Sequence, residues 1–291
     1  MNPKRQSPPT SPLDSIHPIL AELNLTSLAR GLSSLLDQAE RAAPGYTEFL
    51  RQALEIEQAA RHERKVARRI RWSRLGPDVT LDQFDFAARP DLSPNVVREL
   101  CTCRFIEERR NLLLVGRPST GKTTVARAIG HAACRKLYFV LKIPMVEMLE
   151  DLKASRADHT FRKAFQRVTR PDLLILDDAG FSHLDSDAST DLFRVISARH
   201  RTRSTIVISN LPFKAWSELL PSEPQAVAIV DRLVDDATIL RFSGKPFRTP
   251  REVHGAPIPE EEASPTPEIT TASPAAGTTS IWSTSARPAT P

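Results

Sequence analysis

The pattern of apolar and polar positions divides the chain into a helical first part and a second part in which strands and helices alternate. Apolar residues recur at helical spacing from about 19 to 36, and further helices are predicted at about 47–74 and 95–109. Short apolar runs then predict strands at 112–115, 138–141, 173–176, 205–208 and 237–240. Helices at 122–135, 145–167 (with a break) and 187–200 fit between the first four strands. This alternation predicts an α/β fold with a five-stranded parallel sheet and helical crossovers, preceded by a small all-helical N-terminal domain.

Composition changes at both ends of the chain. The first residues are rich in Pro and Ser, and residues 251–291 contain seven prolines among Ser, Thr and Ala. We therefore expect disorder at 1–14 and 251–291, a helical domain at 15–76 and the sheet-containing domain at 77–250. No apolar run is long enough to span a membrane, and the start has no apolar signal segment, so we expect a cytoplasmic protein with no membrane partner.

A glycine-rich segment follows the first predicted strand and fits the phosphate-binding pattern G-x-x-x-x-G-K-[ST]. Such loops direct backbone N–H groups at phosphates, and the helix that follows adds its positive end. Lys122 is expected to reach the β- and γ-phosphates and Thr123 to bind Mg²⁺. A coincidental turn is the alternative, but the position between an apolar strand and a helix argues against it. The predicted ATP-binding residues are Gly116, Arg117, Pro118, Ser119, Thr120, Gly121, Lys122, Thr123 and Thr124.

Polar residues also follow the strands at 173–176 and 205–208. Asp177 is expected to hold Mg²⁺ through water and Asp178 to orient an attacking water, because metals sit at the carboxyl ends of such strands. If the strand at 205–208 lies between the first strand and the acidic one, Asn210 would sit beside the γ-phosphate. The alternatives are a helix cap for the acids and a turn cap for Asn210.

Arg232 lies in a helix-like stretch before the last strand, far along the chain from the phosphate-binding loop. An arginine in such a place can act as a finger on the nucleotide of a neighbouring copy. A solvated or salt-bridged arginine is the alternative.

Charge adds a second theme, because the chain is basic overall at +5 and its last 41 residues carry two arginines against five glutamates. The remainder is therefore strongly basic, which suggests a polyanion partner besides the nucleotide. Seven of the cations fall between residues 61 and 74, where Glu63 is the only acid. Arg61, Arg64, Lys65 and Arg68 share one helical face and suit phosphate contacts that do not read sequence. A solvated helix that keeps the protein soluble is the alternative.

Taken in order, the motifs resemble those of AAA+ P-loop NTPases, and more narrowly the IstB-like ATP-binding transposition helpers, which are kin of the DnaC helicase loaders. The resemblance covers about residues 15–250. The segments that carry it are 44–50, 80–86, 111–116, 152–158, 171–178, 204–213 and 230–234.

The resemblance implies an ATPase that uses ATP and Mg²⁺ and helps an insertion-sequence transposase. It would bind double-stranded DNA with little sequence preference, form a homo-oligomer on it and recruit the cognate transposase to a target. Asp178, Asn210 and Arg232 would then be catalytic, and Thr123 and Asp177 would lie at the metal. Lys153 and Arg156 become DNA-binding candidates by resemblance, although a plain surface helix could also contain them.

The sequence departs from the family's pattern at two residues. Ser119 stands where the family usually has glycine, and a serine fits there if its φ is negative. Asp178 stands where many AAA+ proteins have glutamate, which predicts slow turnover.

Two other functions remain as alternatives. A DnaC-like helicase loader would use residues 1–75 to bind a helicase. A small-molecule kinase would leave Asn210 and the basic helix without a role.

Overall fold

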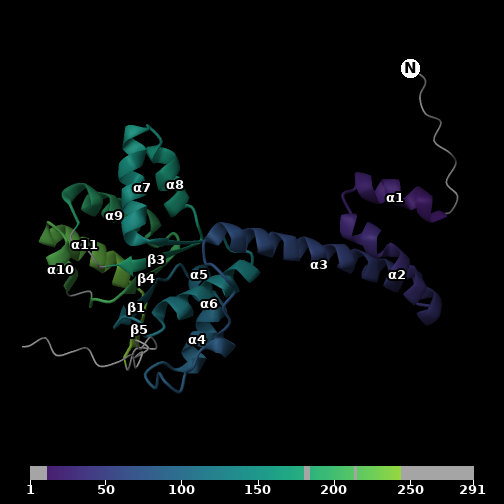
Figure 1. The fold of residues 1–291 in the computed structure, drawn as a ribbon, viewed down its shortest axis with the longest axis horizontal. Coiled ribbons are helices and arrows are strands. Elements are labelled where there is room, and N and C mark those ends of the chain that lie inside the picture. Colours follow the sequence, from purple (N-terminus) through teal and green to yellow (C-terminus); the bar gives the residue numbers. More distant parts are fainter. Residues whose placement is uncertain (1–11, 180–183, 213–214, 244–291) are drawn as a thin grey trace, which may run out of the picture. The chain divides into compact units, whose positions relative to one another are not determined.

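A computed structural model of the chain describes residues 12–179, 184–212 and 215–243 (Figure 1). The tail predicted at 251–291 and residues 1–11 lie outside this part. The elements, in chain order, are α1 (Pro12–Glu22), α2 (Thr26–Ala42), α3 (Tyr46–Ser73), the 3₁₀ helix η1 (Leu81–Gln83), α4 (Pro94–Cys101), α5 (Arg104–Glu107), β1 (Leu112–Gly116), α6 (Lys122–Arg135), β2 (Val140–Pro144), α7 (Met145–Ala157), α8 (Phe161–Thr169), β3 (Leu173–Ala179), α9 (Ser186–Arg199), β4 (Ser204–Ser209), α10 (Trp216–Leu219), α11 (Glu223–Val234) and β5 (Thr238–Phe242).

The five strands form one parallel sheet in the order β2-β3-β4-β1-β5. Strand β4 pairs with β1 and with β3, so the ends of β1, β3 and β4 are neighbours. The prediction that Asn210 approaches the phosphate-binding loop depended on this strand order. The predicted five-stranded parallel sheet with helical crossovers is confirmed.

Helices cover both faces of this sheet (Figure 1). Alternate strand residues point to opposite faces, so Leu112 and Leu114 pack in one core with α4, α5 and α6. Leu113, between them, packs in the other core with α7, α8, α9 and α11. The strands are apolar on both sides because both faces are covered, as is usual for parallel sheets.

The N-terminal helices have a small core of their own, formed by Leu20, Leu28, Leu32, Leu35 and Ala53. Helix α1 begins at Pro12, inside the segment predicted to be disordered, and Asp14 lies in its first turn. Proline and an acid are both favourable at a helix start. The single helix predicted from about 19 to 36 is wrong, since Asn24 adopts a φ of 56° and separates α1 from α2. The apolar spacing continues across this break and therefore could not reveal it.

Two other boundaries differ from the prediction for local backbone reasons. Strand β2 begins at Val140 rather than 138, because Leu137 has a φ of 67° and Tyr138 N–H still bonds to the carbonyl of Ala133 in α6. The helix predicted at 95–109 is divided at Cys103, whose φ is 63°. Cys101, Cys103 and Cys134 are free thiols, and burial raises the pKa of each to about 11.

None of the helices that the structure describes is long and apolar enough to cross a membrane.

Candidate functional site

The glycine-rich loop connects the end of β1 to the start of α6, as predicted. Gly121 precedes the helix with a φ of 96°, a left-handed conformation that glycine adopts without strain. Gly116 has no space for a side chain, because a Cβ there would collide with the carbonyl of Phe242 in β5. Both glycines are therefore required by the path of the backbone.

Ser119 does not meet the condition of a negative φ under which a serine fits this loop, because its φ is 60°. A non-glycine residue in this region costs of order 1 kcal/mol. The loop holds this conformation through neighbouring contacts. The hydroxyl of Thr120 donates to the carbonyl of Arg117 at 2.8 Å, and the buried Arg89 donates its Nε–H to the carbonyl of Thr120 at 2.9 Å. Arg89 lies far from the motif in sequence and carried no signal.

The loop opens into a cavity of about 400 Å³ at the carboxyl edge of the sheet. It contains seven of the nine predicted ATP-binding residues together with both acids and Asn210. Gly116 and Arg117 hold Lys122 through their carbonyls instead. The residues that line the cavity are Pro118, Ser119, Thr120, Gly121, Lys122, Thr123, Thr124, Asp177, Asp178, Ile208 and Asn210.

Lys122 is buried and its ammonium is surrounded by oxygens. It donates to the carbonyls of Gly116 and Arg117 and to Oδ1 of Asn210, each at 2.7 Å. Burial lowers its pKa below the ordinary lysine value, while Asp177 and Asp178 oppose that change. A phosphate oxygen could replace one of these acceptors, so the residues present fit an anionic nucleotide at this position.

The two acids lie on an irregularity of β3. Leu176 pairs with Val207 but Ala179 pairs with Ser209, so β3 holds one extra residue at this point. A bulge of this kind redirects side chains and is common beside functional sites. Asp178 takes a φ of 53° and is exposed, whereas Asp177 is buried. The two neighbours therefore present their carboxylates to different surroundings.

Asp177 is close to the predicted metal ligand of the loop, since its Oδ1 lies 3.3 Å from the hydroxyl of Thr123. Its Oδ2 forms an ion pair of 2.7 Å with Lys142 on β2. A carboxylate and a hydroxyl together are suitable oxygen ligands for Mg²⁺. No sequence pattern indicated Lys142, because its position depends on β2 pairing with β3 in this register.

Although the Asp178 side chain is exposed overall, its partial desolvation and the adjacent Asp177 raise its pKa, against the opposing influence of Lys142 and Lys122. A raised pKa makes a carboxylate a better proton acceptor near neutral pH. This environment suits the predicted contact of Asp178 with an attacking water.

Asn210 contributes its side chain to the cavity and does not cap the next turn. The hydroxyl of Ser209 takes that capping role, accepting from Leu211 N–H at 3.1 Å. The turn-cap alternative for Asn210 therefore fails, and its contact with Lys122 couples the end of β4 to the loop.

Arg232 lies on α11 and is absent from the lining of the cavity. Its guanidinium lies 4.9 Å from the centre of the Phe193 ring and donates to the carbonyl of Ala228 at 2.8 Å. Asn111 fixes the end of α11 by donating to the carbonyls of Arg232 and Leu233. A role for Arg232 as a finger stays a prediction, and it would require a second copy of the chain.

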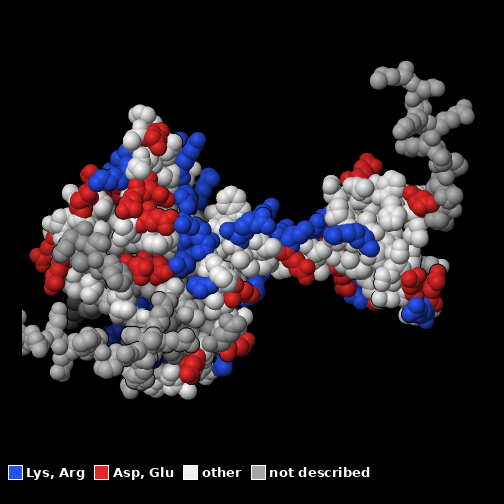
Figure 2. Space-filling model, in the orientation of Figure 1, with Lys and Arg blue, Asp and Glu red and all other residues white. Residues whose placement is uncertain are grey.

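Basic side chains gather along α3 (Figure 2). Their contacts divide the predicted basic face into two parts. Arg61 and Arg64 both bond to the buried Glu57, at 2.9 and 2.8 Å. Glu57 also accepts from the N–H groups of Ser27 and Leu28 at the start of α2. These two arginines thus join α3 to α2, whereas Lys65 and Arg68 are exposed without an ion-pair partner among the described residues.

The candidates on α7 are engaged by acids. Lys153 lies 3.1 Å from Asp185 and remains exposed. Arg156 forms a two-pronged pair with the buried Asp191 and covers the ring of Phe161, which favours a structural role. Their contact with DNA stays a prediction. Arg199 of α9 is fully buried and donates to the backbone carbonyls of Val168 and Pro171, so it is not available to DNA.

The sequence comparisons agree with this geometry. A family profile described as "IstB-like ATP binding protein" matches residues 18–254. The chain belongs to this family. A Pseudomonas aeruginosa protein named for ATP binding and for insertion sequence IS21 is 33% identical over 230 residues, covering 79% of this chain and 87% of the relative. A Geobacillus stearothermophilus relative, named in the same way for insertion sequence IS5376, is 31% identical and covers 81% and 94%.

Solved structures give a weaker likeness. The DnaC helicase loader aligns with 51% of this chain and 87% of its own length at 20% identity and a TM-score of 0.46. This similarity is too low to carry an argument about function. The family match and the observed sheet together confirm the predicted AAA+ P-loop NTPase class.

Proposed function

We propose that this IstB-like protein is an ATP-dependent, DNA-binding helper of an insertion-sequence transposase. The observation that carries the proposal is the convergence of Lys122, Thr123, Asp177 and Asn210 on one cavity at the sheet edge. The relatives named for insertion sequences supply the context. Recruitment of the cognate transposase follows from that context.

The chain's own groups have distinct roles in ATP hydrolysis. Lys122 binds phosphate oxygens, and Asn210 holds its ammonium in place. Thr123 and Asp177 would hold Mg²⁺, which when bound neutralises phosphate charge. Asp178 orients the attacking water. Its side chain is one methylene shorter than the glutamate of many AAA+ proteins, so we expect slow turnover.

Arg232 acts on the nucleotide of a neighbouring copy. The guanidinium lies outside the nucleotide cavity of its own chain, and its contacts among the described residues are the Phe193 ring and the carbonyl of Ala228. Association of copies on double-stranded DNA would place it against a neighbour's γ-phosphate, where an arginine can accelerate hydrolysis by several orders of magnitude. ATPase activity therefore depends on a homo-oligomer.

Mixing two inactive variants tests this scheme. Lys122→Ala should lose ATP binding, and Arg232→Ala should bind ATP but lose DNA-stimulated hydrolysis. An equimolar mixture should recover activity, because some interfaces then pair an intact loop with an intact arginine. Phosphate release and binding of a fluorescent ATP analogue are the measurements.

Two matched controls define the outcome. Lys136→Ala changes an exposed lysine just after the same helix, and Arg98→Ala changes an exposed arginine on α4. Both should behave as the unaltered protein. Normal ATP binding by Lys122→Ala would overturn the nucleotide site, and a mixture that stays inactive would overturn the intersubunit role of Arg232.

A further inference from the structure

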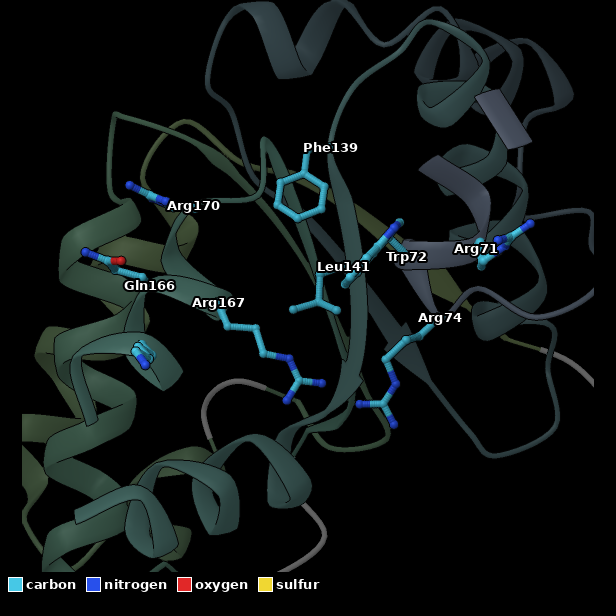
Figure 3. A pocket seen from close by; sticks show the side chains of 9 residues that line it. Arg71, Trp72, Arg74, Phe139, Leu141, Gln166, Arg167 and Arg170 are labelled. Carbon is cyan, nitrogen blue, oxygen red and sulfur yellow. The ribbon is translucent and has the colours of Figure 1, made fainter. Parts of the chain in front are cut away.

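A second cavity, of about 520 Å³, lies between the end of α3, the edge strand β2 and helix α8 (Figure 3). None of its lining residues belongs to the nucleotide site. Its volume is in the range of cavities that bind small molecules or parts of larger ones. Two features of its surface, charge and aromatic area, indicate what it binds.

Cations dominate the wall of this cavity. Arg71 comes from α3 and Arg74 directly follows it, while Lys163 and Arg167 come from α8 and Arg170 follows that helix. Arg74 pairs with Glu147 at 2.6 Å and Arg167 with Asp151 at 3.0 Å. Among the described residues, the other three have no ion-pair partner. The cavity therefore keeps an excess of positive charge that an anion would neutralise.

Apart from Gln166, the remaining wall is apolar and aromatic. Phe139 and Leu141 of the β2 segment line it together with Trp72, whose position on α3 leaves 67% of its surface exposed. In Figure 3 the guanidinium groups of Arg74 and Arg167 extend toward one another across the opening. A ligand that matches this wall combines negative charge with a flat, weakly polar body.

We infer that this cavity binds one nucleotide of DNA whose base has left the duplex stack. Its phosphate would contact the cations from α8, and its base would lie against Trp72. Intact B-form DNA presents phosphates here but no base face, so it would leave the aromatic wall unused. Stacking on an aromatic side chain accepts any base, which agrees with binding that tolerates any sequence.

The position on α3 favours DNA over an acidic peptide as the occupant. Lys65 and Arg68 are exposed on the same helix, one to two turns before the cavity, so a continuous line of cations leads into it. A nucleic-acid strand has phosphates at regular intervals along such a line. The inference rests on the proposed DNA-binding function and adds to it a distortion of the bound DNA.

The experiment compares two duplexes that differ by one unpaired thymine at the centre. Fluorescence anisotropy with the full chain measures affinity at fixed salt. The unaltered protein should bind the duplex with the unpaired base at least about fivefold more tightly, as expected for one stacked base. Trp72→Leu should abolish this preference without changing affinity for the paired duplex, and Trp72→Phe should retain it.

Tyr46→Leu is the matched control, because Tyr46 is 97% exposed at the opposite end of α3 and should not affect the preference. Unchanged ATP binding shows that each variant is folded. Equal affinity of the unaltered protein for both duplexes, with binding that weakens steeply in salt, would overturn this inference and leave the proposed function intact. Failure to bind either duplex would remove the DNA-binding function itself. Tryptophan fluorescence with polyglutamate tests an acidic peptide as the occupant. If the quenching by polyglutamate is lost in Trp72→Phe while the quenching by DNA is retained, the cavity binds a peptide.

Discussion

The nucleotide cavity and the cavity beside α3 both contain cations, but they hold them in different ways. Lys122 is buried and satisfied by three oxygens from the loop and from Asn210. Arg71, Lys163 and Arg170 are exposed side chains without a described ion-pair partner. The first site is fixed by backbone geometry and should be selective, whereas the second is electrostatic and should be sensitive to salt.

Gly116→Ala is the variant with the largest expected effect on this difference. The new Cβ would collide with the backbone of Phe242, which cannot move away as a flexible side chain could. We expect loss of ATP binding and a fall in the free energy of unfolding of about 3 kcal/mol or more. Chemical denaturation and titration with a fluorescent ATP analogue measure both quantities.

Gly31→Ala is the control for that experiment. Gly31 lies inside α2, where a Cβ would have ordinary contact with Ile56, so alanine should stabilise the helix by about 0.5–1 kcal/mol. Equal behaviour of the two alanine variants would show that the loop does not depend on Gly116.

The dependence of the nucleotide cavity on backbone geometry also explains which of its residues could be predicted from the sequence. Asp177 and Asn210 could be placed beside the loop because carboxyl ends of parallel strands meet at one sheet edge. Lys142 could not, because its contact with Asp177 depends on strand register, and β2 begins two residues later than the apolar run indicates. The positive φ of Ser119 arises from contacts made by Arg89 and Thr120, which no local pattern encodes.

For the basic helix α3, the sequence predicted the charge but not the contacts of each side chain. Its charge was evident from the sequence, but the division between arginines bound to Glu57 and exposed cations depends on how α2 packs against α3. The role of Trp72 likewise depends on the packing of α3 against β2 and α8. Patterns of spacing could predict a basic face, but not which of its members are free to bind DNA.

Removal of two exposed cations from α3 should have the next largest effect. Lys65→Gln with Arg68→Gln removes charges that have no described partner, so helix packing should be unaffected. If each contacts one phosphate, the slope of log K against log salt should fall by about 2. Fluorescence anisotropy over a salt series gives this slope, and Arg98→Gln with Arg104→Gln is the control. An unchanged slope would place the DNA elsewhere.

Acid should weaken the N-terminal helices through Glu57. Burial alone would raise the pKa of Glu57, but hydrogen bonds from Arg61, Leu28, Ser27 and Arg64 lower it to about 2. A lowered pKa means that the stabilisation is complete above about pH 4.5 and is lost as the pH falls toward 2. Glu57→Gln should therefore lower the melting temperature at pH 7 and have little effect near pH 2.

Circular dichroism measures these transitions, and Glu55→Gln is the control on the same helix. Glu55 is about half exposed, and its ion-pair partner among the described residues is the exposed Arg51. A difference between Glu57→Gln and the unaltered protein that stays constant from pH 7 to pH 2 would contradict the ionic role of Glu57.

Lys142→Gln tests whether the charge of Lys142 affects the binding of Mg²⁺ at Asp177. The ammonium of Lys142 occupies Oδ2 of Asp177 at 2.7 Å, so it competes for the carboxylate that would hold Mg²⁺. Removing it should lower the Mg²⁺ concentration needed for half-maximal ATP binding several-fold, whereas Lys142→Arg should not. A higher Mg²⁺ requirement in Lys142→Gln would mean that Lys142 assists the site.

Ser119→Gly should have the smallest effect, and it tests directly the view that backbone geometry fixes the nucleotide cavity. Glycine adopts a φ near 60° without the penalty that serine carries, so the loop should lose strain of order 1 kcal/mol. In the free energy of unfolding, the greater freedom of glycine in the unfolded chain offsets part of this gain. Because glycine adopts the loop conformation that lines the cavity more readily, we expect ATP affinity to rise, but only a few-fold, in titrations.

His159→Gly is the matched control, because His159 also has a positive φ of 56° but lies between α7 and α8, outside the nucleotide cavity. It should alter stability and leave ATP affinity unchanged. If Ser119→Gly raises stability to the same degree as His159→Gly but does not raise affinity, the strain at Ser119 is not coupled to nucleotide binding. If affinity falls instead, the serine side chain contributes a contact to the phosphates that outweighs its strained backbone.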